Sequence, residues 1–227
     1  MNCSIIIFPG SNCDKDIANA IENVTKKKPT FVWYLNKVPN NTDLIVLPGG
    51  FSFGDYLRSG AIASKTRIMK AIKEFSKRGI PILGICNGFQ ILTEAGLLPG
   101  TLILNNNLKF ICKTVKLLIC STNNYFTNKF SLNEIIELPI AHKMGNFQIN
   151  EEGLNYLINE NKIVFRYCSS KKNCDETNNP NGSVYNIAGI LGSNNRILGM
   201  MPHPERFYNN KNSKDQIIKK IMYSMNL

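Results

Sequence analysis

The chain has 227 residues, a hydrophobic content of 43% and a formal net charge of +11. This length and composition suit one α/β domain with a sizeable core, and we expect residues 1–227 to form a single domain. The charge could indicate a nucleic-acid partner, but the basic residues are scattered and no nucleic-acid-binding motif accompanies them. The sequence therefore argues against that class.

Apolar runs without alternation recur along the chain, and they predict strands buried on both faces of a sheet. These runs are residues 3–8, 44–47, 80–85 and 197–200. Helical periodicity is found at residues 14–26, 66–77 and 213–225. This alternation predicts an α/β fold with a flavodoxin-like, doubly wound, mostly parallel sheet and helices on both faces.

Two segments depart from this pattern. Residues 109–120 alternate differently, which predicts a small antiparallel extension of the sheet. Residues 169–181 are polar and rich in Lys and Asn, which predicts a surface loop that could contact a partner. The sequence shows no internal repeat and no long linker.

The most informative motif is the segment 84–90, Gly-Ile-Cys-Asn-Gly-Phe-Gln, at the end of the predicted strand 80–85. Glycines flank Cys86 two positions away on either side, which is the pattern of a nucleophile elbow with sulfur in place of oxygen. Such a turn lifts the nucleophile above the carboxyl edge of a sheet. The helix predicted at 89–95 directs its positive N-terminus at Cys86 and favours the thiolate. The motif predicts an acyl-transfer enzyme.

A nucleophilic cysteine needs a base, and the base needs an orienting group. The chain has two histidines, and His203 stands in Met-Pro-His-Pro-Glu after the predicted strand 197–200. The prolines predict an extended segment in which His203 and Glu205 share a face. Taken alone, His-Pro-Glu would more often be a surface turn, and an isolated cysteine a core residue. Together with the elbow around Cys86, they favour a catalytic Cys-His-Glu set.

These motifs resemble those of the class I, triad-type glutamine amidotransferases and, within them, the glutaminase subunits of phosphoribosylformylglycinamidine synthase from purine biosynthesis. The resemblance runs through nearly the whole chain. The matching segments are residues 8–14, 47–58, 84–90, 97–100, 139–142, 179–183 and 199–206.

The resemblance implies a role for each member of the triad. Cys86 would attack the side-chain amide of glutamine and form a glutamyl thioester. His203 would take the thiol proton, pass a proton to the departing ammonia and later activate water. Glu205 would orient the imidazole and stabilise its charged form.

Further residues are expected around the triad. The amide of Asn87 is one candidate donor to the oxyanion, and the turn that contains Gly50 and Phe51 is the expected source of the second. By family analogy, Gln90 and the loop around Phe51 would bind glutamine. For His142 two interpretations stay open: contact with substrate or partner, or a loop histidine held by local hydrogen bonds.

One departure from the family follows His142. The family usually carries Gly-Glu-Gly there, and this chain has Lys143-Met144-Gly145. Loss of the acidic residue would alter contact with the glutamine ammonium group or with the partner. It would be neutral if the backbone makes that contact.

The resemblance also implies partners and cofactors. A synthetase subunit would use ATP and Mg²⁺ to convert formylglycinamide ribonucleotide into formylglycinamidine ribonucleotide with the ammonia, and a small bridging subunit would complete the assembly. This chain has no P-loop, so we expect it to bind no cofactor. It has no paired C-x-x-C, so we expect no metal site. No signal peptide or membrane span is recognisable, so we expect a cytoplasmic protein with reduced thiols.

Two other classes stay open from the sequence. A stand-alone amidase on the same fold would be fully active without a partner, and the loop at 47–58 argues against it. A non-enzymatic regulatory subunit would form no thioester, and the intact set Cys86, His203 and Glu205 argues against it.

Overall fold

The computed structural model describes residues 1–206 and 216–225. The α-helices are α1 (Asp14–Thr25), α2 (Ala61–Ser64), α3 (Arg67–Lys77), α4 (Asn87–Glu94), α5 (Glu151–Asn159) and α6 (Gln216–Ser224). The strands are β1 (Cys3–Ile7), β2 (Thr30–Trp33), β3 (Leu44–Leu47), β4 (Ile82–Ile85), β5 (Thr101–Ile103), β6 (Ile111–Ile119), β7 (Ile135–His142), β8 (Asn146–Gln148), β9 (Ile163–Tyr167), β10 (Ile187–Leu191) and β11 (Ile197–Met200).

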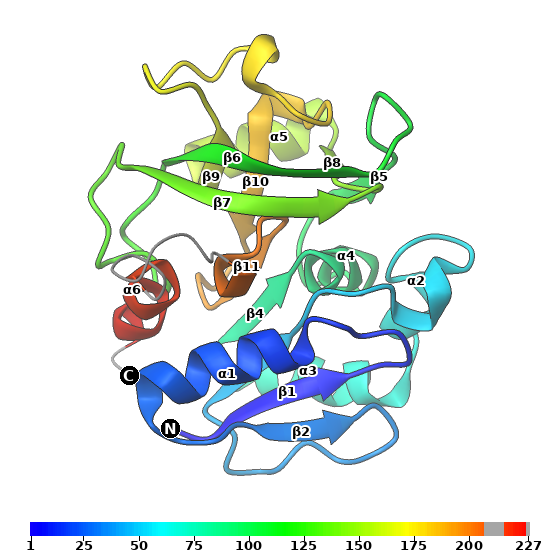
Figure 1. Cartoon of the computed structure of the whole chain (residues 1–227). Coiled ribbons are helices and arrows are strands. Elements are labelled where there is room, and N and C mark those ends of the chain that lie inside the picture. Colours follow the sequence, from blue (N-terminus) through cyan, green and yellow to red (C-terminus); the bar gives the residue numbers. More distant parts are fainter. Residues whose placement is uncertain (207–215, 226–227) are drawn as a thin grey trace.

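One large sheet has the strand order β2-β1-β3-β4-β11-β10-β9-β6-β7. Its first five strands pair in parallel, and this is the flavodoxin-like order if β11 counts as the fifth strand. Helix α1 lies in front of these strands and α3 behind them (Figure 1). Every residue of β3, β4 and β11 is buried, because helices cover both faces. The predicted α/β fold is confirmed.

The rest of the large sheet is antiparallel and lies above the parallel strands in Figure 1. Strands β10, β9, β6 and β7 join it in turn through antiparallel pairs. The predicted extension at residues 109–120 is β6, and three further strands accompany it. Burial alternates along β7, as in a strand with one covered face. Strands β5 and β8 form a separate small sheet.

The predicted elements correspond to the observed ones with small shifts at their ends. The predicted strands are β1, β3, β4 and β11, and the first two predicted helices are α1 and α3. The last predicted helix corresponds to α6, and its residues 213–215 lie outside the described residues. The segment 169–181 has no regular structure apart from a 3₁₀ turn at Glu176–Asn178. Among the described residues, no helix is long and apolar enough to cross a membrane.

The pairing of β4 with β11 positions the candidate site. These two parallel neighbours are in register, with Gly84 beside Gly199 and Ile85 beside Met200. The N–H of Cys86 continues the ladder by donating to the carbonyl of Met200 (2.7 Å). The segments that follow the two strands therefore emerge side by side at the carboxyl edge of the sheet.

Candidate active site

Cys86 occupies a strained turn between β4 and α4. Its backbone angles are φ 51° and ψ −104°, a conformation that is costly for a residue with a side chain and is typical of functional sites. The flanking glycines leave no room for side chains. A Cβ atom on Gly88 would lie 2.0 Å from the carbonyl oxygen of Leu47, and one on Gly84 would lie 2.8 Å from the backbone of Gly88. The turn has the form that the sequence motif predicts.

His203 and Glu205 meet in the segment after β11. Nδ1 of His203 is 2.7 Å from Oε1 of Glu205, and both side chains are buried. The predicted pairing is correct, but the predicted extended conformation is wrong. Residues Pro204–Arg206 form a 3₁₀ turn, which brings the carboxylate back to the imidazole. The N–H of His203 donates to the carbonyl of Pro139 in β7 (2.9 Å), which fixes the start of this turn.

The environment of His203 favours its charged form. Burial by itself lowers the pKa of His203, but the Glu205 carboxylate and the nearby thiols of Cys86 and Cys13 outweigh it, so the pKa lies well above the ordinary value. Nε2 of His203 is buried without a hydrogen-bond partner among the described residues. This nitrogen is free to serve Cys86, in keeping with the loose hydrogen bonds of catalytic groups before substrate binds.

Cys13 is a second thiol beside this pair, and the sequence motifs did not single it out. It is buried at the start of α1, and its sulfur, a nitrogen of His203 and a carboxylate oxygen of Glu205 lie within 4.8 Å of one another. These are ligand types that zinc accepts. An ion on Nε2 of His203 would occupy the nitrogen that is otherwise free to serve Cys86, so metal binding and base catalysis would compete for this histidine. The signal in the sequence was the position of Cys13 within the segment 8–14.

The turn after β3 offers a free backbone donor at Gly50. The N–H of Phe51 donates to the carbonyl of Gly10 (2.9 Å), so it is engaged. Within the described part of the chain, the N–H of Gly50 donates to no acceptor. A Cβ atom on Gly50 would lie 2.6 Å from the same Gly10 carbonyl, and its φ is +151°. Of the two predicted residues, Gly50 is therefore better placed than Phe51 to donate to an oxyanion, because its N–H is not engaged.

Side chains from α4 tie the elbow to its surroundings. Asn87 accepts a hydrogen bond from the N–H of Ser52 (3.1 Å) and donates one to Oε1 of Gln90 (2.8 Å). Gln90 in turn donates from Nε2 to the carbonyl of Met144 (2.6 Å). The predicted residues Asn87 and Gln90 thus lie together, and Gln90 contacts the segment that departs from the family.

His142 is the last residue of β7, rather than a residue of a loop, and it is buried. Its Nδ1 pairs with Oδ1 of Asn105 (3.1 Å), a residue that the sequence analysis missed. Burial lowers the pKa of His142 to about 4, so the ring is neutral. Its Nε2 has no partner among the described residues. The carbonyl of the preceding Ala141 lies 3.7 Å from the sulfur of Cys86, so this end of β7 borders the nucleophile.

The segment that follows His142 makes its contacts mainly through the backbone. The Lys143 carbonyl accepts from the N–H of Asn105 (2.9 Å), and the Met144 carbonyl accepts from Gln90. The Met144 sulfur also accepts a hydrogen bond from the hydroxyl of Ser59 (3.2 Å). This arrangement favours the interpretation in which backbone contacts make the replacement of Gly-Glu by Lys143-Met144 tolerable.

The chain as a whole is similar to known proteins in sequence and in structure. The family described as the CobB/CobQ-like glutamine amidotransferase domain matches residues 1–222. The chain belongs to this family. Curated relatives agree: the phosphoribosylformylglycinamidine synthase subunit PurQ of Zymomonas mobilis is 48% identical over 91% of this chain and 90% of the relative. The PurQ subunit of Aquifex aeolicus is 46% identical over 91% of each.

Solved structures have the same amidotransferase fold. The structure described as PurLQS from Thermotoga maritima contains a chain that superposes with a TM-score of 0.84 at 38% identity, covering 99% of this chain and 97% of that one. A glutamine amidotransferase from the same organism has a TM-score of 0.61 at 17% identity, with the same coverage. The second likeness shows the fold alone.

Proposed function

We propose that this amidotransferase is the glutaminase subunit of phosphoribosylformylglycinamidine synthase. It hydrolyses glutamine and delivers ammonia to a synthetase partner, which converts formylglycinamide ribonucleotide to formylglycinamidine ribonucleotide. The observation that carries the proposal is the buried pair of His203 and Glu205, 2.7 Å apart, beside the elbow that holds Cys86. Relatives at 45–48% identity with the PurQ name support the choice of this synthase.

The first half-reaction is acyl transfer to sulfur. The Cys86 thiolate attacks the side-chain carbonyl carbon of glutamine while Nε2 of His203 holds the thiol proton. The resulting oxyanion is placed to accept hydrogen bonds from the N–H groups of Asn87 and Gly50. His203 then gives its proton to the leaving nitrogen, ammonia departs, and a glutamyl thioester remains on Cys86.

The second half-reaction regenerates the thiol. Neutral His203 takes a proton from water, the hydroxide attacks the thioester carbon, and the same two N–H groups stabilise the oxyanion. The C–S bond breaks, glutamate leaves, and the proton on His203 returns to sulfur. Glu205 holds the ring in one tautomer and stabilises the imidazolium that forms in each half-reaction.

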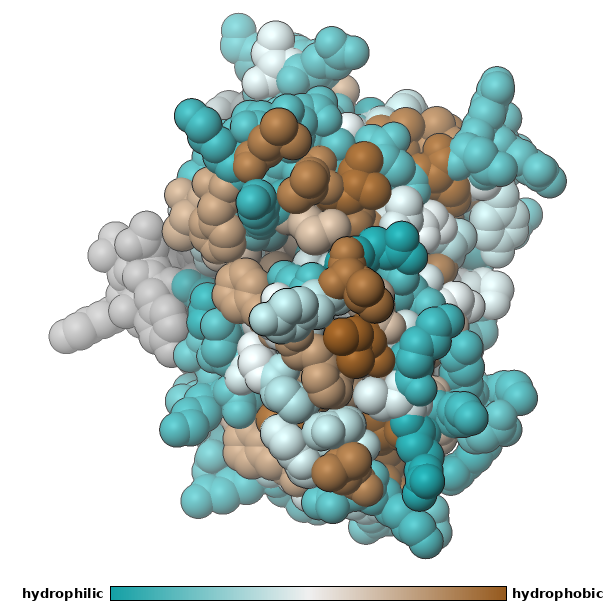
Figure 2. Space-filling model, turned by 90° about the vertical axis from the view of Figure 1, so that its right-hand side faces the viewer, coloured by the Kyte–Doolittle hydropathy of each residue, from teal (hydrophilic) through white to brown (hydrophobic). Residues whose placement is uncertain are grey.

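The partner has a suitable surface to cover. Figure 2 shows apolar side chains gathered down the middle of the face toward which the parallel strands point in Figure 1. Segments on this side include the loop before α2, in which Leu57 is 92% exposed, and β5, in which Ile103 is 41% exposed. Large apolar patches on a protein surface usually mark interaction sites. ATP and Mg²⁺ would bind the synthetase partner rather than this chain, a small bridging subunit would join them, and the complex would work in the cytoplasm.

The test is glutamine hydrolysis by the purified chain, with and without the synthetase partner loaded with nucleotide. We expect weak activity alone and a sharp rise with the partner. Cys86→Ala should abolish glutamine-dependent synthesis and spare ammonia-dependent synthesis by the partner. Full activity alone would indicate a stand-alone amidase. No hydrolysis in either case, with Cys86 reduced, would indicate a regulatory subunit.

A further inference from the structure

The segment Asn179–Ser183, Asn-Pro-Asn-Gly-Ser, has no part in the triad chemistry, yet its structure is tightly specified. Oδ1 of Asn179 accepts hydrogen bonds from the N–H groups of Asn181 (3.2 Å) and Gly182 (2.8 Å), and its Nδ2 donates to the carbonyl of Ser183 (2.8 Å). Gly182 has φ +90°, and a Cβ atom there would lie 2.2 Å from the side chain of Asn106. The segment is therefore a preformed turn.

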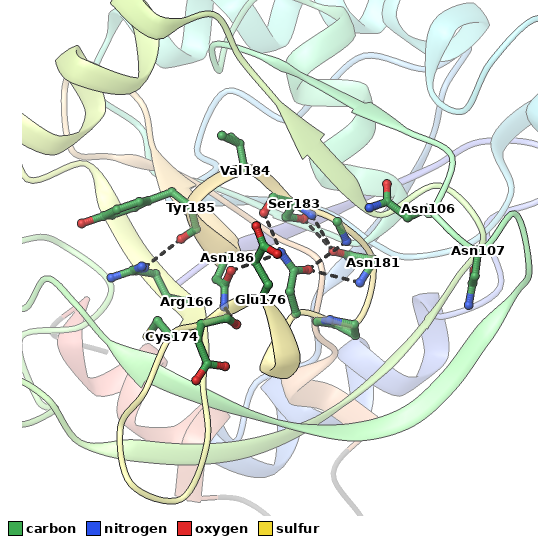
Figure 3. Close-up of a pocket in the computed structure, with 14 residues that line it drawn as sticks. Asn106, Asn107, Arg166, Cys174, Glu176, Asn181, Ser183, Val184, Tyr185 and Asn186 are labelled. Carbon is green, nitrogen blue, oxygen red and sulfur yellow. Dashed lines mark hydrogen bonds between the residues drawn. The ribbon is translucent and has the colours of Figure 1, made fainter.

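Figure 3 shows this turn from the side of a surface pocket of about 820 Å³, with the side chains of Asn181 and Ser183 bonded to each other. Both side chains are only 2% exposed, so they serve an internal partner. The partner that both side chains share is the carbonyl oxygen of Gly145. Nδ2 of Asn181 donates to it at 2.8 Å, and the hydroxyl of Ser183 lies 3.2 Å from it. The hydroxyl of Ser183 has a single proton, and Oδ1 of Asn181 (2.8 Å) competes with the Gly145 carbonyl for it. Of the two hydrogen bonds to the Gly145 carbonyl, the one from Nδ2 of Asn181 is therefore the stronger. In addition, Oγ of Ser183 accepts a hydrogen bond from the N–H of Phe147 (3.0 Å), and Nδ2 of Asn181 lies 3.4 Å from the hydroxyl of Tyr167.

Gly145 is also held from its other side. Its N–H donates to Oδ1 of Asn105 (3.1 Å), the atom that pairs with the ring of His142. A Cβ atom on Gly145 would lie 2.2 Å from Cε1 of His142, so the backbone is packed against the imidazole. The N–H and the carbonyl of Gly145 are both hydrogen-bonded, and its Cα packs against the imidazole of His142. These contacts together fix the position of the Gly145 backbone.

The residue before Gly145 reaches the candidate glutamine site. The carbonyl of Met144 accepts the hydrogen bond from Nε2 of Gln90 (2.6 Å), and Gln90 is in turn bonded to Asn87, next to the nucleophile. The carbonyl of Ala141 lies 3.7 Å from the sulfur of Cys86. The residues from Ala141 to Gly145 thus line the space beside Cys86 and Gln90. The turn at 179–183 supports this segment through its hydrogen bonds to the Gly145 carbonyl.

We propose that Asn181 and Ser183 are positioning residues for glutamine recognition. They act through the carbonyl of Gly145, which sets the adjoining Met144 carbonyl and thereby the amide of Gln90. This inference rests on the proposed function, since it assigns a role in binding the substrate of that reaction. It gives the segment 179–183 a task in recognition, separate from the bond-making steps at Cys86.

The test uses Asn181→Asp, which replaces the donating NH₂ by an oxygen that faces the Gly145 carbonyl, and Ser183→Ala as a milder second variant. Each is assayed with the synthetase partner for kcat and KM. Each is also assayed for two alkylations of Cys86: by iodoacetamide, which needs no glutamine site, and by 6-diazo-5-oxonorleucine, which must be recognised as glutamine. For Asn181→Asp we expect KM to rise about tenfold and the rate of Cys86 alkylation by the diazo reagent to fall about tenfold. This is the effect of losing one buried hydrogen bond. The iodoacetamide rate should stay within about twofold, because the triad itself is unchanged.

The matched control is Asn124→Asp. Asn124 is also buried and also donates to a backbone carbonyl, that of Ser121 (3.2 Å), but its side-chain hydrogen bonds all stay within residues 121–127. It should leave KM and both alkylation rates unchanged. The proposal is overturned if the Asn181 and Ser183 variants fold and keep the wild-type KM. It is also overturned if both alkylation rates fall together, which would mean a general loss of structure. Failure of the proposed function would appear earlier, as absence of Cys86-dependent hydrolysis in the wild-type complex.

Discussion

The N–H of Ser52 donates a hydrogen bond to the side chain of Asn87 over a distance of 3.1 Å, between residues 35 positions apart in the sequence. This bond joins the turn after β3, which contains Gly50, to the first residue of α4, which follows the nucleophile. The two candidate oxyanion donors are therefore held at a fixed separation before substrate arrives. Such preorganisation is the main source of electrostatic catalysis in enzymes of this kind.

Replacing Asn87 with Ala should therefore slow catalysis without abolishing it. The backbone donors remain, but their relative position loosens, so we expect kcat to fall about tenfold to a hundredfold, less than the ~10²–10³ lost when a donor itself is removed. Steady-state kinetics of glutamine hydrolysis checks this. Ser52→Ala is the control, because it keeps the N–H and removes only a hydroxyl that has no partner among the described residues. A wild-type kcat for Asn87→Ala would contradict the role of this bond.

The elbow should tolerate no side chain at Gly88. Because a Cβ atom there would lie 2.0 Å from the Leu47 carbonyl, Gly88→Ala should separate α4 from β3 and lower the free energy of unfolding by about 3 kcal/mol or more. Gly96→Ala is the matched control. Unlike Gly88, Gly96 has a positive φ, +69°, but it has open space around its Cβ position, so only the backbone strain of about 1 kcal/mol applies. Equal losses in urea denaturation would refute the steric argument.

Glu205→Gln should lower the pKa of His203 and the rate together. The carboxylate is the largest of the influences that offset the effect of burial on the pKa of this imidazole, and an amide carries no charge to replace it. We expect kcat to fall by about 10²–10⁴, as when the orienting carboxylate of a triad is removed. NMR titration of His203 in a Cys86→Ser background measures the pKa directly. Glu134→Gln breaks the ion pair with Lys220 instead and should leave both the pKa of His203 and kcat unchanged.

Acid should destabilise the protein through His142. Its pKa is lowered to about 4 by burial, from an ordinary value of 6.5, so the unfolded chain binds a proton that the folded protein rejects in this range. Stability should fall as the pH drops from about 6.5 to 4, by up to ~1.4 kcal/mol per pH unit from this one group. The slope of the unfolding free energy against pH reports the number of protons taken up on unfolding. In His142→Asn this number should be smaller by about one over that pH range.

His203 has the opposite effect on the pH dependence of stability, so the contributions of the two histidines can be distinguished. Its pKa is raised in the folded protein, so its contribution to stability is full below the unfolded pKa and is lost as the pH rises through the folded pKa. Urea denaturation at several pH values distinguishes them. An unchanged acid slope in His142→Asn would contradict the assignment.

The residues that the sequence predicted well are those whose role depends on local pattern. The glycines around Cys86 and the prolines around His203 constrain the backbone within a few residues, so the elbow and the His-Glu pair could be anticipated. The parallel strands also follow from their unbroken apolar runs. The 3₁₀ turn at Pro204–Arg206 was missed because two prolines disfavour α-helix but still allow a tighter turn.

What the sequence could not supply are contacts between residues far apart in the chain. The bond from Asn105 to His142 and the approach of Cys13 to His203 leave no periodic pattern. The extent of the antiparallel half was missed for a related reason. Short apolar runs such as β9 and β10 could be strands or buried helix segments by their pattern alone. Which of the two they form depends on the strands they pair with in the folded protein.

The position of β11 in the sheet has a consequence for biosynthesis. This strand lies between β4 and β10, although it is made long after β4 leaves the ribosome. Until residues 197–203 are translated, β4 has an open edge and Cys86 lacks both its backbone partner Met200 and its proposed base His203. We therefore expect a nascent chain that lacks this strand to hydrolyse no glutamine, and insertion of this one strand completes the sheet and the proposed triad in the same event.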